Sequence, residues 1–226
     1  MTTILSNLDL LKRVPLFSPL TAEQADAIAD VVNKRHFKRG EILVKQHHRS
    51  DELFILLAGR VRLVSSHKSG RQMVLNKLRS GEILDEISLI DDLPHSATAL
   101  AEIPTDVLTL SRSDFMRCMQ DNSHIAHAVM SRLVQRLRQA DRKIESLALM
   151  DVHGRVGRAL VEHAAPSDGG AMVIHEKISR QDIAKMVGAS REMVSRVMKD
   201  LEARGFIQTN SPSRMTLRES LVRSLA

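Results

Sequence analysis

Residues 178–202 read ISRQDIAKMVGASREMVSRVMKDLE and contain the start and stop signals of two consecutive helices. Ser179, followed three positions later by Asp182, is a capping-box-like pattern that predicts the start of a helix. Gly188 supplies a stop for this helix, and Ser190 follows closely enough to cap a second one. Two helices joined by so short a glycine-containing turn form a helix-turn-helix.

The second of these helices has two chemically different faces. Apolar residues at helical spacing predict its buried side: Val194, Val197, Met198 and Leu201. The opposite side carries the polar and charged residues Arg191, Glu192, Ser195, Arg196 and Lys199. An arginine can donate two hydrogen bonds to guanine and a glutamate can accept one from cytosine, and the first turn of such a helix reaches base edges in the major groove. We therefore predict that this side binds DNA, together with three residues at the helix starts: Ser179, Arg180 and Ser190.

The rest of the C-terminal half supports this interpretation. The stretches 206–209 and 215–217 flank the turn-forming residues 210–213, a pattern typical of a two-stranded wing. Residues 1–123 contain 16 basic and 16 acidic residues, whereas residues 124–226 contain 17 and 11, so the whole net charge of +6 lies in the C-terminal half. A basic half joined to a neutral half indicates a module that binds a polyanion, most commonly nucleic acid; a solvated basic face is the alternative.

A long periodic segment precedes this module. Seven apolar residues alternate in steps of four and three, the a/d pattern of a coiled coil: Ala126, Met130, Leu133, Leu137, Ala140, Ile144 and Leu147. At 1.5 Å per residue the helix is roughly 33 Å long. So narrow and long a stripe predicts pairing with a second copy in a parallel homodimer, with the residues from Met130 to Leu147 at the interface. Packing against the chain's own β domain is the alternative.

The N-terminal half has a different texture. Thr21 and Gln24 form a capping-box pattern before an amphipathic stretch, so short helices are expected there. From about residue 37 to residue 111, short apolar runs are punctuated by the turn-forming residues Gly40, Gly59, Gly70 and Gly81. Turn signals roughly 8–12 residues apart predict an antiparallel sandwich, barrel or roll rather than a parallel sheet.

The segment 178–202 closely resembles the helix-turn-helix of the Crp-Fnr family of bacterial transcription regulators, and the similarity covers essentially the whole chain. The resemblance implies an α+β fold. We expect a β-roll of the cyclic-nucleotide-binding type with flanking short helices over residues 1–122. A dimerisation helix and hinge over 123–149 and a winged helix DNA-binding domain over 150–226 complete the expected organisation.

The same resemblance implies partners. In the family, the residues matching Arg191, Glu192 and Arg196 read bases. The expected target is therefore a two-fold-symmetric DNA duplex with half-sites close to TGTGA, about one helical turn apart. We also expect RNA polymerase as a partner of the DNA-bound dimer.

One stretch departs from the family pattern. The family's phosphate-binding cassette has Gly-Glu and, about ten residues later, Arg-Ser; the glycine amide and the arginine hold the cyclic phosphate, and the glutamate holds the ribose hydroxyl. Here Asp85, Glu86, His95 and Ser96 occupy these positions. Residues 80–111 contain seven acidic residues and neither lysine nor arginine, which disfavours an anionic phosphate unless cations come from elsewhere. The candidate cations are Arg60, Arg62 and Arg71 on neighbouring strands and Arg142, Arg155 and Arg158 near the hinge, and we select Arg71.

Four hypotheses for this cassette stay open. In the first, Asp85 accepts hydrogen bonds from the N1–H and N2–H groups of a guanine, which suits cyclic di-GMP, and we favour this effector over cyclic AMP. In the second, the cassette is structural and the protein binds no effector. In the third, His95 donates to the phosphate of a cyclic mononucleotide such as cyclic AMP. In the fourth, the carboxylates and His95 hold a divalent cation.

Composition excludes several classes of protein. Of 226 residues, 43% are hydrophobic and 27% are charged, as in a soluble globular protein of one or two domains. The longest apolar run, Leu53–Ala58, is far short of the ~20 residues that cross a bilayer, and no signal-peptide core precedes it, so we expect a cytoplasmic protein. The single Cys118 cannot form a disulfide framework or a thiolate metal site. Without a nucleophile, Walker or Rossmann motif we expect no enzyme; the rival hypothesis is a ligand-binding or protein-interaction module without operator binding.

Overall fold

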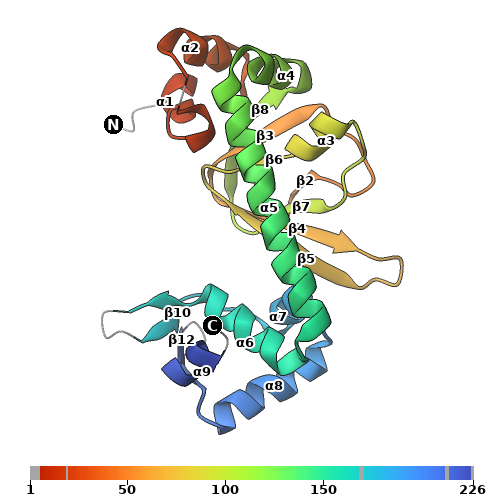
Figure 1. Ribbon diagram of the computed structural model, residues 1–226, viewed down its shortest axis with the longest axis vertical. Coiled ribbons are helices and arrows are strands. Elements are labelled where there is room, and N and C mark those ends of the chain that lie inside the picture. Colours follow the sequence, from red (N-terminus) through yellow and green to blue (C-terminus); the bar gives the residue numbers. More distant parts are fainter. Residues whose placement is uncertain (1–5, 19, 168–170, 212–213, 225–226) are drawn as a thin grey trace. The chain divides into compact units, whose positions relative to one another are not determined.

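The computed structural model describes residues 6–18, 20–167, 171–211 and 214–224. The chain divides into two compact units, Met1–Leu137 and Arg138–Ala226, each with its own hydrophobic core. The boundary lies inside one continuous helix, α5 (Ser123–Leu149), which contributes residues to both units (Figure 1). Among the described residues, no helix is both long enough and apolar enough to cross a membrane.

Two four-stranded antiparallel sheets form most of the first unit. Their orders are β1-β8-β3-β6 and β2-β7-β4-β5. The strands are β1 (Asn33–Phe37), β2 (Ile42–Val44), β3 (Glu52–Ala58), β4 (Arg60–Ser66), β5 (Gln72–Arg79), β6 (Ile83–Leu84), β7 (Thr98–Ala101) and β8 (Thr105–Ser111). One buried cluster takes Phe37 and Phe54 from the first sheet and Leu63 and Ala99 from the second, so the two sheets share a core. The expected antiparallel roll is confirmed.

Helices flank this roll. They are α1 (Asn7–Leu11), α2 (Ala22–Val31), α3 (Glu86–Asp91), α4 (Arg112–Asp121) and the first half of α5, with a 3-10 turn at Pro15–Phe17. The expected capping box at α2 is present: the Thr21 hydroxyl accepts from the Gln24 backbone N–H at 3.3 Å, and the Gln24 side chain accepts from the Thr21 N–H at 3.1 Å. These bonds satisfy backbone donors that a helix start leaves unpaired.

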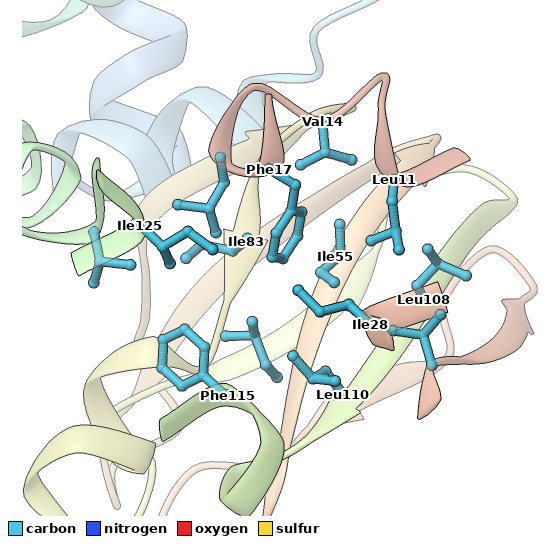
Figure 2. Close-up of a cluster of buried hydrophobic side chains, with 14 of the residues drawn as sticks. Leu11, Val14, Phe17, Ile28, Ile55, Ile83, Leu108, Leu110, Phe115 and Ile125 are labelled. Carbon is cyan, nitrogen blue, oxygen red and sulfur yellow. The ribbon is translucent and has the colours of Figure 1, made fainter. Parts of the chain in front are cut away.

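Strand β3 is buried on both faces because each face meets a different core. Leu53 and Ile55 point into a cluster beneath the helices, whereas Phe54 and Leu56 point into the cluster shared by the two sheets. This alternation is the ordinary geometry of a strand. Figure 2 shows the first cluster, in which Ile55, Ile83, Leu108 and Leu110 of the strands meet Leu11, Val14, Phe17 and Ile28 of the N-terminal segment, Phe115 of α4 and Ile125 of α5.

The turn between β3 and β4 requires a glycine. Gly59 has a φ of +99°, a conformation that L side chains rarely adopt. A Cβ atom at this position would lie 2.4 Å from Thr105 Oγ1 and 2.6 Å from the Pro104 carbonyl oxygen. The absence of a side chain therefore lets this turn approach the start of β8.

The second unit is a winged helix-turn-helix. Beyond α5 its elements are α6 (Val152–His163), β9 (Ala165–Pro166), β10 (Met172–Ile174), α7 (Arg180–Val187), α8 (Arg191–Ala203), β11 (Ile207–Ser211), β12 (Arg214–Leu217) and α9 (Glu219–Ser224). The strands pair in the order β11-β12-β10-β9. The expected wing is the antiparallel β11–β12 hairpin, although residues 212–213 at its tip lie outside the described residues. The α+β class, with roll, long helix and winged helix-turn-helix in that order, is thus confirmed.

Candidate functional site

The helix-turn-helix is held by local caps. The Ser179 hydroxyl accepts from the Asp182 N–H at 3.1 Å and donates to the Asp182 carboxylate at 2.6 Å. Gly188 ends α7 in the left-handed conformation with a φ of +65°, and the Ser190 hydroxyl accepts from the Met193 N–H at 3.2 Å to begin α8. Each such cap stabilises a helix by about 1 kcal/mol. Both helices therefore begin where the sequence predicts, and α7 also ends where it predicts.

Helix α8 buries one side and exposes the other. Its buried residues are Val194, Val197, Met198 and Leu201, which pack against Ile183, Ala184 and Val187 of α7. Four of the predicted DNA-binding side chains are exposed on the remaining surface: Arg191, Glu192, Arg196 and Lys199. Ser195 is half-buried, and its hydroxyl donates to the Arg191 carbonyl at 2.9 Å. Long charged side chains are thus displayed on a rigid element.

The other predicted DNA-binding residues have structural partners. The hydroxyls of Ser179 and Ser190 act as helix caps. The Arg180 guanidinium lies 3.9 Å from the Glu202 carboxylate. Sequence reasoning missed Met193, an apolar side chain in the first turn of α8 that remains 47% exposed. The only indication in the sequence is that an apolar residue stands among charged ones on this side of the helix. Such a side chain is suited to contact a thymine methyl group.

Glu192 is held as an anion. Its own backbone N–H, and then the Ser190 hydroxyl, donate to its carboxylate and lower its pKa; the neighbouring Arg191 and Arg196 lower it further. A carboxylate at the first turn of a helix is also favoured by the helix dipole. At neutral pH this side chain is therefore an acceptor, which is the role that recognition of a cytosine amino group requires.

A second cluster of polar residues lies at the start of α3 in the roll. Asp85 adopts a φ of +82° and is 6% exposed. Its Oδ1 atom accepts from His95 Nδ1 at 2.7 Å, and its Oδ2 atom accepts from the Ser50 hydroxyl at 2.7 Å. Ser88 Oγ lies 3.2 Å from the same His95 nitrogen, and His95 is 4% exposed. The two residues that depart from the family pattern are therefore in direct contact.

Burial raises the pKa of Asp85. The hydrogen bond from Ser50 and the charge of His95 oppose this shift, as do hydrogen bonds from Ser88 and His95. Desolvation penalises a buried carboxylate, whereas donors compensate for the lost water. Asp85 and His95 are therefore buried polar residues that each have a hydrogen-bond partner.

Glu86, the next residue, is fully buried and bound from α5. Its Oε1 atom accepts from Arg136 at 2.5 Å, and one turn earlier on α5 Arg132 donates to Glu82 at 2.9 Å and to the Ile83 carbonyl at 3.3 Å. The Oε2 atom of Glu86 has no hydrogen-bond partner among the described residues. Sequence reasoning missed both arginines, although their spacing of four residues matches that of the two glutamates.

The remaining predicted effector residues are not gathered at this cluster. Ser96 is exposed. Arg71 is exposed at the turn between β4 and β5, where its Nε donates to Ser69 at 3.3 Å, and Figure 1 shows that turn apart from α3. Arg155, one of the alternative cations, belongs to the second unit and donates there to the carbonyl oxygens of Val187 and Met150. The cation nearest to Glu86 is thus Arg136 and not Arg71.

Helix α5 exposes an apolar stripe. Met130 is 57% exposed, Leu137 62% and Ile144 64%. Among the other predicted interface residues, Ala140 and Leu147 are exposed, whereas Leu133 is half-buried against the core of the first unit. Val134, which the heptad reading missed, is 50% exposed. At this turn of α5 the exposed apolar residue is therefore Val134, whereas the heptad pattern predicted Leu133.

Comparisons with known proteins agree with this arrangement. Two family models match the chain: a cyclic nucleotide-binding domain over residues 34–122 and a Crp-like helix-turn-helix domain over residues 154–221. The cyclic AMP receptor protein of Thermus thermophilus is 30% identical over 210 residues, which cover 93% of this chain and 95% of that protein. The cAMP-activated global transcriptional regulator Vfr of Pseudomonas aeruginosa is 32% identical over 183 residues, which cover 77% and 85%. The solved structure of the c-di-GMP responsive global regulator CLP of Xanthomonas campestris has a TM-score of 0.76 at 24% identity and covers 87% of this chain and 98% of that one.

Proposed function

The chain belongs to the Crp-Fnr family of DNA-binding transcription regulators, and on that premise we propose that it acts as a sequence-specific homodimer and not as an enzyme. The observation that carries this proposal is the exposed face of α8. A helix with one side fully packed presents Arg191, Glu192, Arg196 and Lys199 to solvent on a capped, rigid element. This is the arrangement that direct reading of bases in a major groove requires.

Individual roles follow from side-chain chemistry. Arg191 and Arg196 donate to guanine O6 and N7, and Glu192 accepts from cytosine N4. Lys199, with Arg180 at the start of α7, binds the phosphate backbone and fixes the position of the helix. The Ser179 and Ser190 hydroxyls donate to Asp182 and Glu192 and support this position as helix caps. The expected operator is a palindrome with half-sites close to TGTGA, and the bound regulator acts on RNA polymerase.

The dimer rests on α5. An apolar stripe whose large side chains are 38% to 64% exposed on a single chain needs a covering surface. A second copy supplies one because a/d positions of parallel helices pair with themselves across a two-fold axis. Two copies of α8 then read two half-sites one helical turn apart.

The roll is the regulatory part of the proposal. As a cyclic nucleotide-binding domain it suits a cyclic nucleotide effector, and the two relatives named for cyclic AMP support that class. We place cyclic di-GMP before cyclic AMP because a carboxylate and a histidine replace the glycine and arginine that hold a cyclic phosphate. A guanine on Asp85 must then displace Ser50 or His95, since both oxygens of Asp85 already accept hydrogen bonds.

Because both oxygens of Asp85 already have hydrogen-bond partners within the chain, a second candidate function is a regulator that needs no effector. With Asp85 bound to His95 and Glu86 bound to Arg136, the cassette is held by contacts within the chain. Calorimetry of the purified protein against cyclic AMP, cyclic GMP and cyclic di-GMP separates the two candidates. Heat with cyclic di-GMP that disappears in Asp85→Ala supports the first, and no heat with any of the three supports the second.

A salt series tests DNA binding against the rival module without operator binding. The affinity of the protein for a duplex should fall steeply between about 50 and 200 mM salt, because each phosphate contact releases counterions. Fluorescence anisotropy with a labelled duplex measures it. A protein-interaction module would show no such slope, and a flat or absent response would contradict the proposal.

A further inference from the structure

A buried carboxylate joins three separate segments of the roll. Asp85 lies at the start of α3, Ser50 lies in the loop between β2 and β3, and His95 lies in the loop between α3 and β7. The same two loops are paired through their backbones, with the His47 N–H donating to the His95 carbonyl at 2.9 Å and the His95 N–H donating to the His48 carbonyl at 2.9 Å. The side chain of Asp85 thus links the two loops to the first turn of α3.

The backbone at Asp85 is strained in order to place this anion. A φ of +82° costs an L residue about 1–2 kcal/mol relative to ordinary conformations, and glycine would avoid that cost. Helix capping does not offset this conformational cost, since the Asp85 carboxylate makes no capping hydrogen bond to α3. The hydrogen bonds of the carboxylate with Ser50 and His95 offset the strain. The positive φ of Asp85 therefore places its carboxylate for these two contacts.

The carboxylates of Asp85 and Glu86 can take the place of the phosphate of an effector because they carry the same type of charge. A cyclic phosphodiester and a carboxylate each carry one negative charge and accept hydrogen bonds. In the roll, the donors at this point are the buried His95 and the partly exposed Arg136, which are bound to Asp85 and Glu86. A phosphate would therefore compete with two anions that are covalently part of the chain and whose local concentration cannot be diluted.

We propose that the Asp85 carboxylate is a built-in substitute for the anionic group of an effector, and that it holds the cassette in its DNA-binding-competent state without any ligand. This inference rests on the proposed function in its second form, the regulator that needs no effector, and it names the group that replaces the effector. The Glu86–Arg136 contact carries that state to α5, because Glu86 directly follows Asp85 and Arg136 lies on the helix that bears the dimer stripe. The regulator is thus active by default.

The experiment restores the pattern of a phosphate cassette in the full chain. Asp85→Gly with His95→Arg removes the internal anion and supplies a cation, and the glycine also relieves the positive φ. The matched control is Asp106→Gly with His36→Arg, which alters an exposed Asp–His pair of the same 2.7 Å length on β8 and β1. Anisotropy on a duplex selected by the unaltered protein measures DNA affinity, and calorimetry with cyclic AMP as the probe measures ligand binding.

The unaltered protein and the control should bind the duplex without nucleotide, and cyclic AMP should change their affinity by less than about twofold. The double variant should bind about tenfold or more weakly without nucleotide and recover with cyclic AMP, the range expected for coupling between two sites. Asp85→Asn keeps the shape of the side chain but not its charge, so it should lose DNA affinity even if the double variant folds poorly. Circular dichroism checks folding of each.

Three results would overturn the inference. If the unaltered protein bound DNA only after a cyclic nucleotide was added, the inference would fall while the proposed function stood. If the double variant and Asp85→Asn kept full affinity without nucleotide, the internal anion would have no such role. If the unaltered protein selected no duplex with or without nucleotide, the proposed function would fall and the inference with it.

Discussion

Arg191, Glu192 and Arg196 distinguish α8 from an ordinary amphipathic helix. A surface helix needs only polar residues on its exposed side, whereas these three combine paired guanidinium groups with a carboxylate whose pKa is lowered by hydrogen bonds from its own N–H and from Ser190. Local signals were sufficient to find them, because caps and helical spacing act over a few residues. Their exposure in the structure agrees with that reasoning.

Replacing Arg196 tests base reading. Arg196→Ala should weaken binding to a TGTGA-type duplex by about 1–3 kcal/mol and relax the preference at the base it contacts. Competition anisotropy with duplexes altered at one position measures both effects. Arg204→Ala is the control, since Arg204 caps the far end of α8 beside Asp200 and Phe206. Equal losses in the two variants would show that only net charge matters.

The buried carboxylate of Asp85 makes the stability of the roll depend on pH. Because burial raises its pKa in the folded state, the unfolded chain releases this proton at lower pH than the folded chain does. The contribution of Asp85 to stability is therefore fully present at acid pH and is lost as the pH rises through the raised pKa. Asp85→Asn cannot release that proton.

The urea midpoint of Asp85→Asn relative to the unaltered protein should accordingly rise with pH across the range in which carboxyl groups titrate, and then level off. Denaturation followed by circular dichroism at a series of pH values provides the measurement. A difference that falls as pH rises would contradict the sign of the shift.

Contacts between distant residues were beyond sequence reasoning at this scale. The resemblance indicated Asp85 and His95 as exchanged residues, but nothing in their spacing shows that the two side chains meet at 2.7 Å. Arg136 lies 50 residues from Glu86, and only the packing of α5 on the roll brings them together. Arg71 was selected on the assumption that a strand next to the cassette would supply the cation. Arg71 instead lies in the turn between β4 and β5, and this turn is apart from α3 (Figure 1).

At the scale of elements, α5 shows what periodicity can and cannot decide. The heptad pattern found a long helix with an apolar stripe, and the helix extends over Ser123–Leu149. It could not tell which of two adjacent apolar residues faces the chain's own core, because Leu133 and Val134 both fit the apolar sector. The core of the first unit takes Leu133, which leaves Val134 exposed.

A charge in the stripe should separate the dimer. Leu137→Lys places a cation at a position that is 62% exposed in the single chain and covered in the proposed dimer. Light scattering should then report the mass of one chain, 25.3 kDa, in place of two. Gln135→Lys adds the same charge to an exposed position outside the stripe and should leave the dimer intact. An unchanged mass for Leu137→Lys would remove α5 from the interface.

The β3–β4 turn offers a test of the roll itself. Gly59→Ala combines an unfavourable positive φ with an overlap at 2.4 Å from Thr105, so it should lower the free energy of unfolding by at least about 2 kcal/mol. Gly70→Ala has a φ of +80° but open space around its Cβ, and it should cost only about 1 kcal/mol. Urea denaturation of the two variants compares them. Equal costs would mean that the close approach at Gly59 is relaxed in solution.

At the scale of the whole molecule, a neutral roll and a basic winged helix share one helix. Each unit has its own core, and the excess of positive charge lies in the C-terminal half. This division suits a protein in which one part responds and the other binds a polyanion. Charge and composition indicated that division from the sequence, while the matches over residues 34–122 and 154–221 assign a family to each part.

Selection of duplexes from a random-sequence library shows whether two copies of α8 read a specific DNA sequence. A dimer that presents two copies of α8 should enrich a palindrome whose half-sites resemble TGTGA and whose centres are about 10.5 base pairs apart. The same selection with Arg191→Ala and Arg196→Ala combined should enrich no such motif. Sequencing of the unaltered protein's pool that revealed no enriched motif, or a single unpaired half-site, would contradict the account.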